Sequence, residues 1–387
     1  MDILTEICEK RRADIKSKGF SFGHKIPQKR IRPVIPFLEK PGTILEIKRA
    51  SPSKGWIAPE LDAAETAENY IKAGTRAISC LTEENYFHGS LGDLQKAAQT
   101  ADKNAAILRK DFLLEPEEIE ISYLCGADAV LLIGRILDTE KLLAMSKKAF
   151  EYGISVLLEI REESDIKKAF DVLELADTMN CSKKILLGIN SRDLKTFAID
   201  LLIPLKLKEK IRRIYIEENK KFPFPGIVSE SGIKTPEAAS FAGKLDFHAV
   251  LIGEAAARNP KNAKRLVKSF SEAAEEDFGA LKELYSSGFP RVLVDAKNLE
   301  SANAGGDSRY GGTGKTIPSE LIAKSKKAGP LWLSGGLNPE NIRYMIKNFQ
   351  PELVDVNSGV ESAPGKKDFY KLEKFFQQLN LLFNKNF

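Results

Sequence analysis

Residues 44–55, Ile-Leu-Glu-Ile-Lys-Arg-Ala-Ser-Pro-Ser-Lys-Gly, place a carboxylate and an ammonium group where they could act on a ligand. The apolar start of this run favours a β-strand, and the alternation of a strand puts Glu46 and Lys48 on the same side. Buried charges are costly unless they serve each other or a ligand. The loop that follows offers hydroxyls, a cation and a glycine to an anion. A surface salt bridge at the end of a strand is the alternative.

Polar residues and glycines also end five further short apolar runs. They are Lys110; Glu159; Asn190 and Ser191; Glu230, Ser231 and Gly232; and Gly253. If these runs are parallel strands of one barrel, their carboxyl ends meet on one face, where such barrels assemble their active sites. Each charged residue alone could equally be a solvated neighbour of a loop or helix. Because six strand ends agree, we expect a shared active site.

The glycines after the last two of these runs predict a phosphate-binding site. Glycine lets backbone N–H groups approach an anion closely, and the N-terminus of a following helix adds partial positive charge. We therefore expect a small phosphorylated substrate. The alternative is that Gly232 and Gly253 only make tight turns between strand and helix.

The elements that would position these residues alternate regularly along the chain. Short apolar segments begin near residues 44, 77, 106, 128, 154, 185, 225 and 248, and charged stretches of helical period separate them. Eight strand-helix units predict a closed parallel (β/α)8 barrel of the TIM type within residues 1–272. An N-terminal helical extension with Ile3, Leu4, Ile7 and Ile15 precedes it, and no glycine-rich dinucleotide loop follows the first strand.

Composition limits the classes of partner. The chain has 387 residues and a net charge of +5, without an Arg-rich arm, so we expect no nucleic acid partner. No apolar run is long enough to cross a bilayer, and we expect no membrane partner. Cys8, Cys80, Cys125 and Cys181 form no CxxC pair, which predicts free thiols in the cytoplasm. Three histidines without ligand spacing predict no metal site, and nothing indicates an organic cofactor.

Long motifs in the barrel carry a family resemblance. They occupy residues 46–55, 81–91, 108–112, 126–133, 188–197 and 228–233. From residue 1 to about residue 270 the chain resembles indole-3-glycerol phosphate synthase of tryptophan biosynthesis. Members of that family are carboxy-lyases. They close the ring of 1-(2-carboxyphenylamino)-1-deoxyribulose 5-phosphate with loss of carbon dioxide and water. The resemblance implies the same reaction here.

The resemblance also implies roles for individual residues. Lys110 would be the general acid for ring closure, and Glu159 the second acid/base, assisting dehydration. Lys48 would reach the substrate's anionic groups, and Glu46 would orient Lys48 and Lys110 by charge pairing. Asn190 would hold the hydroxyl and carboxylate region in place. Ser51, Ser231, Gly232 and Gly253 would hold the phosphate, and Glu230 would contribute to substrate binding. Phe87, Phe112 and Leu131 would form the slot for the aromatic ring, although Phe112 and Leu131 could equally be core residues.

Residues 273–387 resemble the C-terminal portion of phosphoribosylanthranilate isomerase, with about three strand-helix units. Asp295 matches the general acid of that family, and Gly311, Gly312, Gly335, Gly336 and Ser358 match its phosphate loops. The Lys-Ile-Cys-Gly segment that supplies the general base is missing. We therefore expect little or no isomerase activity. The open sheet edges of such a remnant would need cover, either from the barrel or from self-association with a second copy.

Alternative functions are a bifunctional synthase and isomerase, a non-catalytic phosphate-binding docking protein, and another enzyme acting on a sugar phosphate. The intact set Lys48, Lys110 and Glu159 favours a catalyst, because converging buried charges are costly and a docking module has no use for them.

Overall fold

The computed structural model describes residues 3–192, 198–200, 202–275, 292–294, 317, 319–328, 330–363 and 365–383. The chain divides into two compact units, Met1–Glu275 and Glu276–Phe387. The division lies close to the expected boundary between residues 272 and 273. Each unit is described by itself below.

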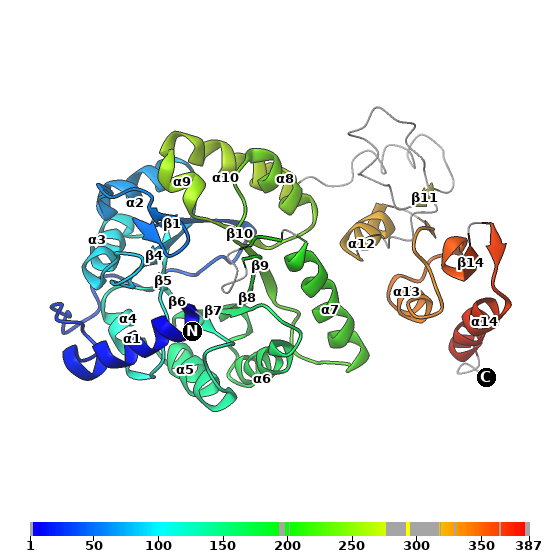
Figure 1. The fold of residues 1–387 in the computed structure, drawn as a ribbon, viewed down its shortest axis with the longest axis horizontal. Coiled ribbons are helices and arrows are strands. Elements are labelled where there is room, and N and C mark those ends of the chain that lie inside the picture. The colour runs from blue at the N-terminus through cyan, green and yellow to red at the C-terminus, as the bar shows by residue number, and fades with distance from the viewer. Residues whose placement is uncertain are drawn as a thin grey trace. The chain divides into compact units, whose positions relative to one another are not determined.

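The first unit is a closed barrel of eight parallel strands, each hydrogen-bonded to its neighbours along the chain (Figure 1). The strands are β1 (Gly42–Ile47), β4 (Ala77–Leu81), β5 (Ala106–Lys110), β6 (Ala129–Ile133), β7 (Ser155–Ile160), β8 (Ile185–Asn190), β9 (Gly226–Glu230) and β10 (Ala249–Ile252). They begin close to the eight expected positions. Nearly all of their residues are buried, because helices cover the outside and side chains fill the interior. The predicted TIM barrel is confirmed.

Helices surround the strands (Figure 1). They are α2 (Ala63–Lys72), α3 (Leu91–Ala101), α4 (Glu117–Leu124), α5 (Thr139–Glu151), α6 (Asp165–Thr178), α7 (Ile203–Glu217), α8 (Pro236–Lys244), α9 (Glu254–Arg258) and α10 (Pro260–Glu275). Several begin at side chains that cap free N–H groups: Asp62, Ser90, Asp138 and Thr235 accept hydrogen bonds from the first turns of α2, α3, α5 and α8.

The N-terminal extension consists of α1 (Ile3–Lys18) and a connector that runs to the first strand. Asp128, which precedes β6, fastens this connector to the barrel. Its two carboxylate oxygens each lie 2.6 Å from a guanidinium nitrogen, one of Arg30 and one of Arg32. The same carboxylate accepts the backbone N–H groups of Ile35 and Ile107. A buried charge with four partners fixes the path of the connector.

The loop after β1, expected to be irregular, contains a short antiparallel hairpin of β2 (Ala50–Ser51) and β3 (Gly55–Trp56). The ring of Trp56 stacks on that of His88 in the loop after β4, with centroids 4.2 Å apart. The loop after the first strand therefore contacts the loop after the second.

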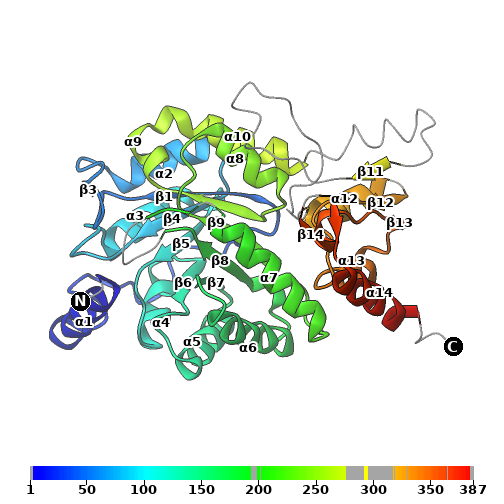
Figure 2. The ribbon, with the colours of Figure 1, turned by 45° about the vertical axis from the view of Figure 1, so that its right-hand side comes forward.

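The second unit has a parallel three-stranded sheet in the order β11 (Val292–Val294), β12 (Leu331–Leu333) and β13 (Leu353–Val354). Three helices, α12 (Ser319–Ala328), α13 (Ile342–Phe349) and α14 (Phe369–Phe383), accompany it (Figure 2). These elements agree with the expected three strand-helix units. A small hairpin of β14 (Glu361–Ala363) and β15 (Lys366–Lys367) was not expected.

Within the described part of the chain, no helix is both long and apolar enough to span a membrane. All four cysteines are free thiols. Among the described residues there is also no group of three or more His, Cys, Asp or Glu side chains placed to hold a metal ion.

Candidate active site

Four charged side chains form one layer inside the barrel. Glu46, Lys110, Glu159 and Glu230 come from β1, β5, β7 and β9, which are alternate strands of the closed sheet. Layers of four side chains from alternate strands normally fill such barrels with branched apolar residues. Here the layer at the carboxyl ends holds three carboxyl groups and an ammonium. The three glutamates are at most 5% exposed.

Lys110 lies between two of these carboxylates. Its Nζ atom is 3.8 Å from Oε2 of Glu159 and 3.7 Å from Oε2 of Glu230. Nζ of Lys48, the residue that follows β1, lies 2.7 Å from Oε1 of Glu46. Because these ion pairs lie at the end of the barrel where active sites form, they can act on a ligand bound above them.

The charges of this layer set the protonation states of its members. Burial would lower the pKa of Lys110, but the carboxylates of Glu230, Glu159 and Glu46 outweigh it and raise that pKa above its ordinary value. For Glu46, burial would raise the pKa, but the ammonium groups of Lys48 and Lys110 lower it. At neutral pH the site therefore holds Lys110 as an ammonium and Glu46 as a carboxylate.

Glu230 differs from the other carboxyl groups. Burial, followed by the proximity of Glu159, raises its pKa well above the usual range despite the opposing charge of Lys110. Both of its carboxylate oxygens are buried, and neither has a hydrogen-bond partner among the described residues. A group in this state can hold a proton near neutral pH or receive a hydrogen bond from a bound ligand.

Two glycines make room for these side chains. A Cβ atom at Gly188, on β8 between the strands of Glu159 and Glu230, would lie 1.9 Å from Oε1 of Glu230. A Cβ atom at Gly253 would lie 2.6 Å from Oε1 of Glu46 and 2.7 Å from Nζ of Lys48. Any side chain at either position would displace a charged group of the layer. Gly253 thus has a steric role in addition to the phosphate contact expected for it.

One pocket contains all the barrel residues that the sequence predicted for the site. Its lining includes Glu46, Lys48, Ser51, Phe87, Lys110, Phe112, Leu131, Glu159, Asn190, Glu230, Ser231, Gly232 and Gly253. The rings of Phe87 and Phe112 lie 6.0 Å apart at the apolar side of this lining. Phe112 and Leu131 are buried, so they belong to the core as well as to the pocket wall.

The turn after β9 has a backbone suited to binding an anion. Ser231 and Gly232 both adopt positive φ angles, 68° and 83°. The hydroxyl of Ser191 donates hydrogen bonds to the carbonyl oxygens of Glu230 and Ser231, which holds this turn in place. Consecutive residues in such conformations expose backbone N–H groups to a phosphate.

Comparison with known proteins assigns the barrel to a family. The family model for indole-3-glycerol phosphate synthase matches residues 4–269. This protein belongs to the indole-3-glycerol phosphate synthase family. The indole-3-glycerol phosphate synthase of Acinetobacter baylyi is 36% identical over 232 residues, which cover 60% of this chain and 79% of the relative. The synthase of Carboxydothermus hydrogenoformans is 39% identical over 227 residues, covering 59% and 78% of the two chains.

The second unit has its own match. The family model for N-(5'-phosphoribosyl)anthranilate isomerase covers residues 254–378, so an isomerase-like segment is fused to the synthase barrel. Asp295, Gly311 and Gly312 lie outside the described residues. Gly335 and Gly336 follow β12 with φ angles of 82° and 66°, and Ser358 begins a 3-10 helix after β13. The two described segments that the sequence matched to phosphate loops therefore follow neighbouring strands.

Other residues of the synthase pocket were not predicted. Ile3, Leu4 and Ile7 of α1 line it, and so does Arg192, whose guanidinium donates a hydrogen bond to the hydroxyl of Ser53 at 3.3 Å. The helical spacing of the α1 residues was visible in the sequence, but nothing there showed which surface they cover. Arg192 follows Asn190 by two residues, so the alternation of a strand could have found it.

Proposed function

We propose that this protein is an indole-3-glycerol phosphate synthase. It would convert 1-(2-carboxyphenylamino)-1-deoxyribulose 5-phosphate into indole glycerol phosphate, carbon dioxide and water. The observation that carries the proposal is Lys110, a half-buried ammonium between Glu159 and Glu230, in a pocket whose lining includes aromatic residues and the turn after β9. A substrate with a phenyl ring, a carboxylate and a phosphate matches these features.

Lys110 is the general acid for ring closure in this proposal. Its raised pKa keeps the ammonium protonated, so it can give a proton to the sugar carbonyl oxygen as the aromatic carbon attacks the carbonyl carbon. The carbonyl oxygen becomes a hydroxyl. Carbon dioxide then leaves, and the electrons of the broken C–C bond restore the aromatic ring. Fixed charges of this kind stabilise the charge that develops on oxygen.

Glu159 is the second acid/base, and it acts in dehydration. The hydroxyl takes up a proton and leaves as water, while the neighbouring carbon loses a proton to complete the indole. Glu159 lies within 3.8 Å of Lys110, so the two groups can act on the same oxygen in turn. Glu230, with its raised pKa and with oxygens that have no hydrogen-bond partner among the described residues, would bind a substrate hydroxyl beside them.

The remaining residues hold the substrate. The ammonium of Lys48 attracts the carboxylate of the substrate, and Glu46 keeps that ammonium in place at 2.7 Å. Asn190 extends from the end of β8 toward the same region. Ser51, Ser231, Gly232 and the backbone at Gly253 surround the phosphate, and the aromatic ring enters the slot formed by Phe87, Phe112 and Leu131.

The direct test supplies the purified full-length protein with the carboxyphenylamino substrate. We expect indole fluorescence to rise in step with carbon dioxide release, one molecule of each per substrate. If neither product appears, the proposal is overturned.

The four free thiols also favour a reducing, cytoplasmic location for this chemistry.

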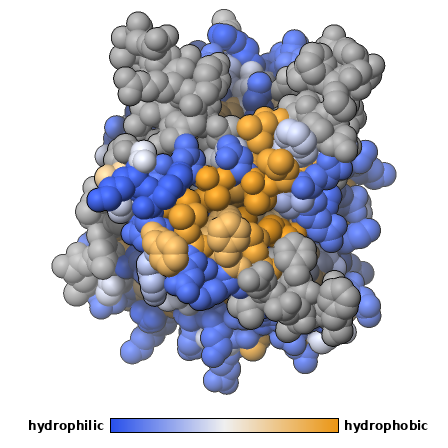
Figure 3. Space-filling view, turned by 90° about the vertical axis from the view of Figure 1, so that its right-hand side faces the viewer, coloured by the Kyte–Doolittle hydropathy of each residue, from blue (hydrophilic) through white to orange (hydrophobic). Residues whose placement is uncertain are grey.

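We also propose that the second unit associates with a second copy of itself. Leu293, Trp332 and Leu353 pair in register across the three strands, so they form an apolar row on one face of the sheet. Leu293 is 46% and Leu353 40% exposed, and apolar side chains gather on the face shown in Figure 3. Parallel sheets are usually covered on both faces, and this row is self-complementary across a twofold axis. Sedimentation equilibrium of the full chain should show a dimer; a monomer at all concentrations would contradict this.

A further inference from the structure

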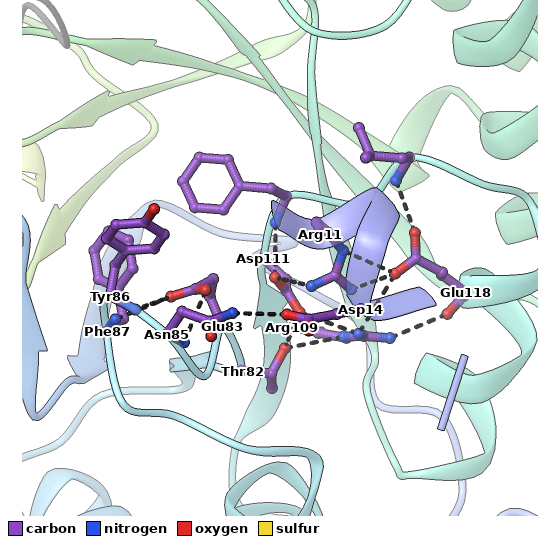
Figure 4. A network of polar contacts seen from close by, with 12 residues as sticks. Arg11, Asp14, Thr82, Glu83, Asn85, Tyr86, Phe87, Arg109, Asp111 and Glu118 are labelled. Atoms are coloured by element: carbon purple, nitrogen blue, oxygen red, sulfur yellow. Dashed lines mark hydrogen bonds and ion pairs between the residues drawn. The ribbon is translucent and has the colours of Figure 1, made fainter. Parts of the chain in front are cut away.

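We propose that Arg11 is a positioning residue that ties α1 to the segment carrying Lys110. It thereby holds Leu4 and Ile7 of α1 in the lining of the substrate pocket. This inference rests on the synthase function proposed above. It concerns a residue that touches neither the expected substrate position nor the reacting groups. Figure 4 shows the contacts on which it depends.

Arg11 connects two elements of the barrel to the helix that precedes it. Its Nη1 atom donates a hydrogen bond to Oδ1 of Asp111 at 2.7 Å, and its Nε atom donates to Oε1 of Glu118 at 3.1 Å, where Nη2 also donates. Asp111 immediately follows Lys110, and Glu118 lies in the first turn of α4. The arginine is only 5% exposed, so this tie is shielded from water.

The two carboxylates are held firmly from the barrel side. Asp111 accepts the backbone N–H of Phe112 at 2.8 Å and the hydroxyl of Thr82 at 2.5 Å. Arg109, completely buried, lies 3.1 Å from the same carboxylate. Glu118 accepts the backbone N–H groups of residues 114 and 115. Because the carboxylates are already fixed, Arg11 positions α1 against them rather than the reverse.

The face of α1 that carries Arg11 also lines the pocket. Ile7 and Arg11 are four residues apart and therefore lie on the same side of the helix, as does Leu4 one turn earlier. Leu4 and Ile7 are at most 4% exposed and belong to the pocket lining beside Phe87 and Phe112. If the tie at Arg11 is lost, we expect these two side chains to leave the aromatic slot.

Other polar contacts of α1 with the barrel include partners closer to solvent, among them an ion pair between Lys18 and Glu84 at 3.6 Å. Asn85 donates to Asp14 at 2.8 Å, and the hydroxyl of Tyr86 donates to Glu6 at 2.7 Å in an exposed pair. Asn85 and Tyr86 belong to the loop after β4, whose N–H groups bind the carboxylate of Glu83. In the hydrogen bonds of Arg11 both partners are buried, so their loss costs more than the loss of a solvent-exposed pair.

A purely structural role would have a different signature. Arg11, Arg109, Asp111 and Glu118 together carry two positive and two negative charges, so removal of Arg11 leaves a buried negative charge and lowers stability in either case. In the double variant Arg11→Met/Glu118→Gln, the positive charge of Arg109 balances the negative charge of Asp111. The hydrogen bonds that connect α1 to Asp111 and Glu118 are still missing. The double variant therefore separates the charge balance of the cluster from the positioning of the helix.

The experiment measures KM and kcat of the full-length protein with the carboxyphenylamino substrate, together with hydrogen exchange in residues 3–18. Arg11→Met should raise KM about tenfold, because apolar contacts with the aromatic ring are lost, and should speed exchange in α1. The double variant should show the same raised KM. If Arg11→Met fails to fold, the KM of the double variant is the measurement that tests the inference. The control is Arg12→Met, because Arg12 is exposed on the same helix and should leave KM unchanged.

A KM that returns to the wild-type value in the double variant, or that never rises in Arg11→Met, overturns the inference. Wild-type protein that forms no product overturns instead the proposed function. The two failures are therefore distinguishable.

Discussion

The buried layer of Glu46, Lys110, Glu159 and Glu230 shows how neighbours decide the chemistry of single residues. Lys110 keeps its proton because carboxylates outweigh the cost of its burial, whereas Glu230 is driven toward its neutral form by burial and by Glu159. The same layer thus supplies both a cation that donates a proton and a carboxyl group whose charge is unfavourable. Opposite pKa shifts of neighbouring groups are typical of active sites.

Glu230→Gln should change how stability depends on pH. A raised pKa means that the folded wild type keeps a proton that the unfolded chain loses above pH about 4.3, so wild-type stability falls as the pH rises from there toward the raised pKa. The Gln side chain has no such proton. The stability of the variant relative to wild type should therefore increase with pH, by at most about 1.4 kcal/mol per pH unit. Denaturant unfolding from pH 5 to 8 measures this, and parallel curves for the two proteins would argue against it.

At the scale of the elements, the barrel brings strand ends together that are far apart in the sequence. The alternation of apolar runs was enough to predict the eight strands. The polar residues at their ends predicted the charged part of the pocket lining, and the family resemblance added Ser51, Phe87, Phe112 and Leu131. Sequence pattern did not reveal that α1 covers the pocket, because Leu4 and Ile7 show only an apolar face and not its partner. It also did not reveal Gly188, whose importance depends on a side chain from the neighbouring strand.

Gly188→Ala should reduce synthase activity while the barrel still folds. The added methyl group would overlap with the carboxylate of Glu230, which must then shift from its position beside Lys110. Displacements of about 1 Å in an active site can lower the rate about 100-fold, and we expect a fall in kcat/KM of that order. Gly42→Ala on β1 is the matched control, because its methyl group would meet Leu38 at an ordinary 3.5 Å. Equal kcat/KM for both variants would refute the role of Gly188.

At the scale of the whole molecule, the chain combines a synthase barrel with an isomerase-like unit of three strands. The barrel has its charged layer, its pocket and the turn of Ser231 and Gly232 after β9. The second unit has glycine loops after two strands but no cysteine in its sequence, and the cysteine is the general base of the isomerase family that it resembles. We therefore expect one catalytic activity from the two units.

The full-length protein should not isomerise phosphoribosylanthranilate above background, because the segment that would carry the base is missing. The measurement follows consumption of that substrate, with the synthase substrate given to the same sample as a control for active protein. Turnover of about 1 s⁻¹ or faster would instead support the bifunctional alternative.

The most direct test of the central claim compares Lys110→Ala with wild type in the synthase assay. Loss of the general acid should lower kcat about 10²- to 10⁴-fold, while circular dichroism shows an intact barrel. Lys72→Ala is the control, since Lys72 is exposed on α2 and paired with Glu68 of its own helix, and its loss should leave kcat unchanged. Undiminished product formation by Lys110→Ala would contradict the assignment of Lys110 as the catalytic acid.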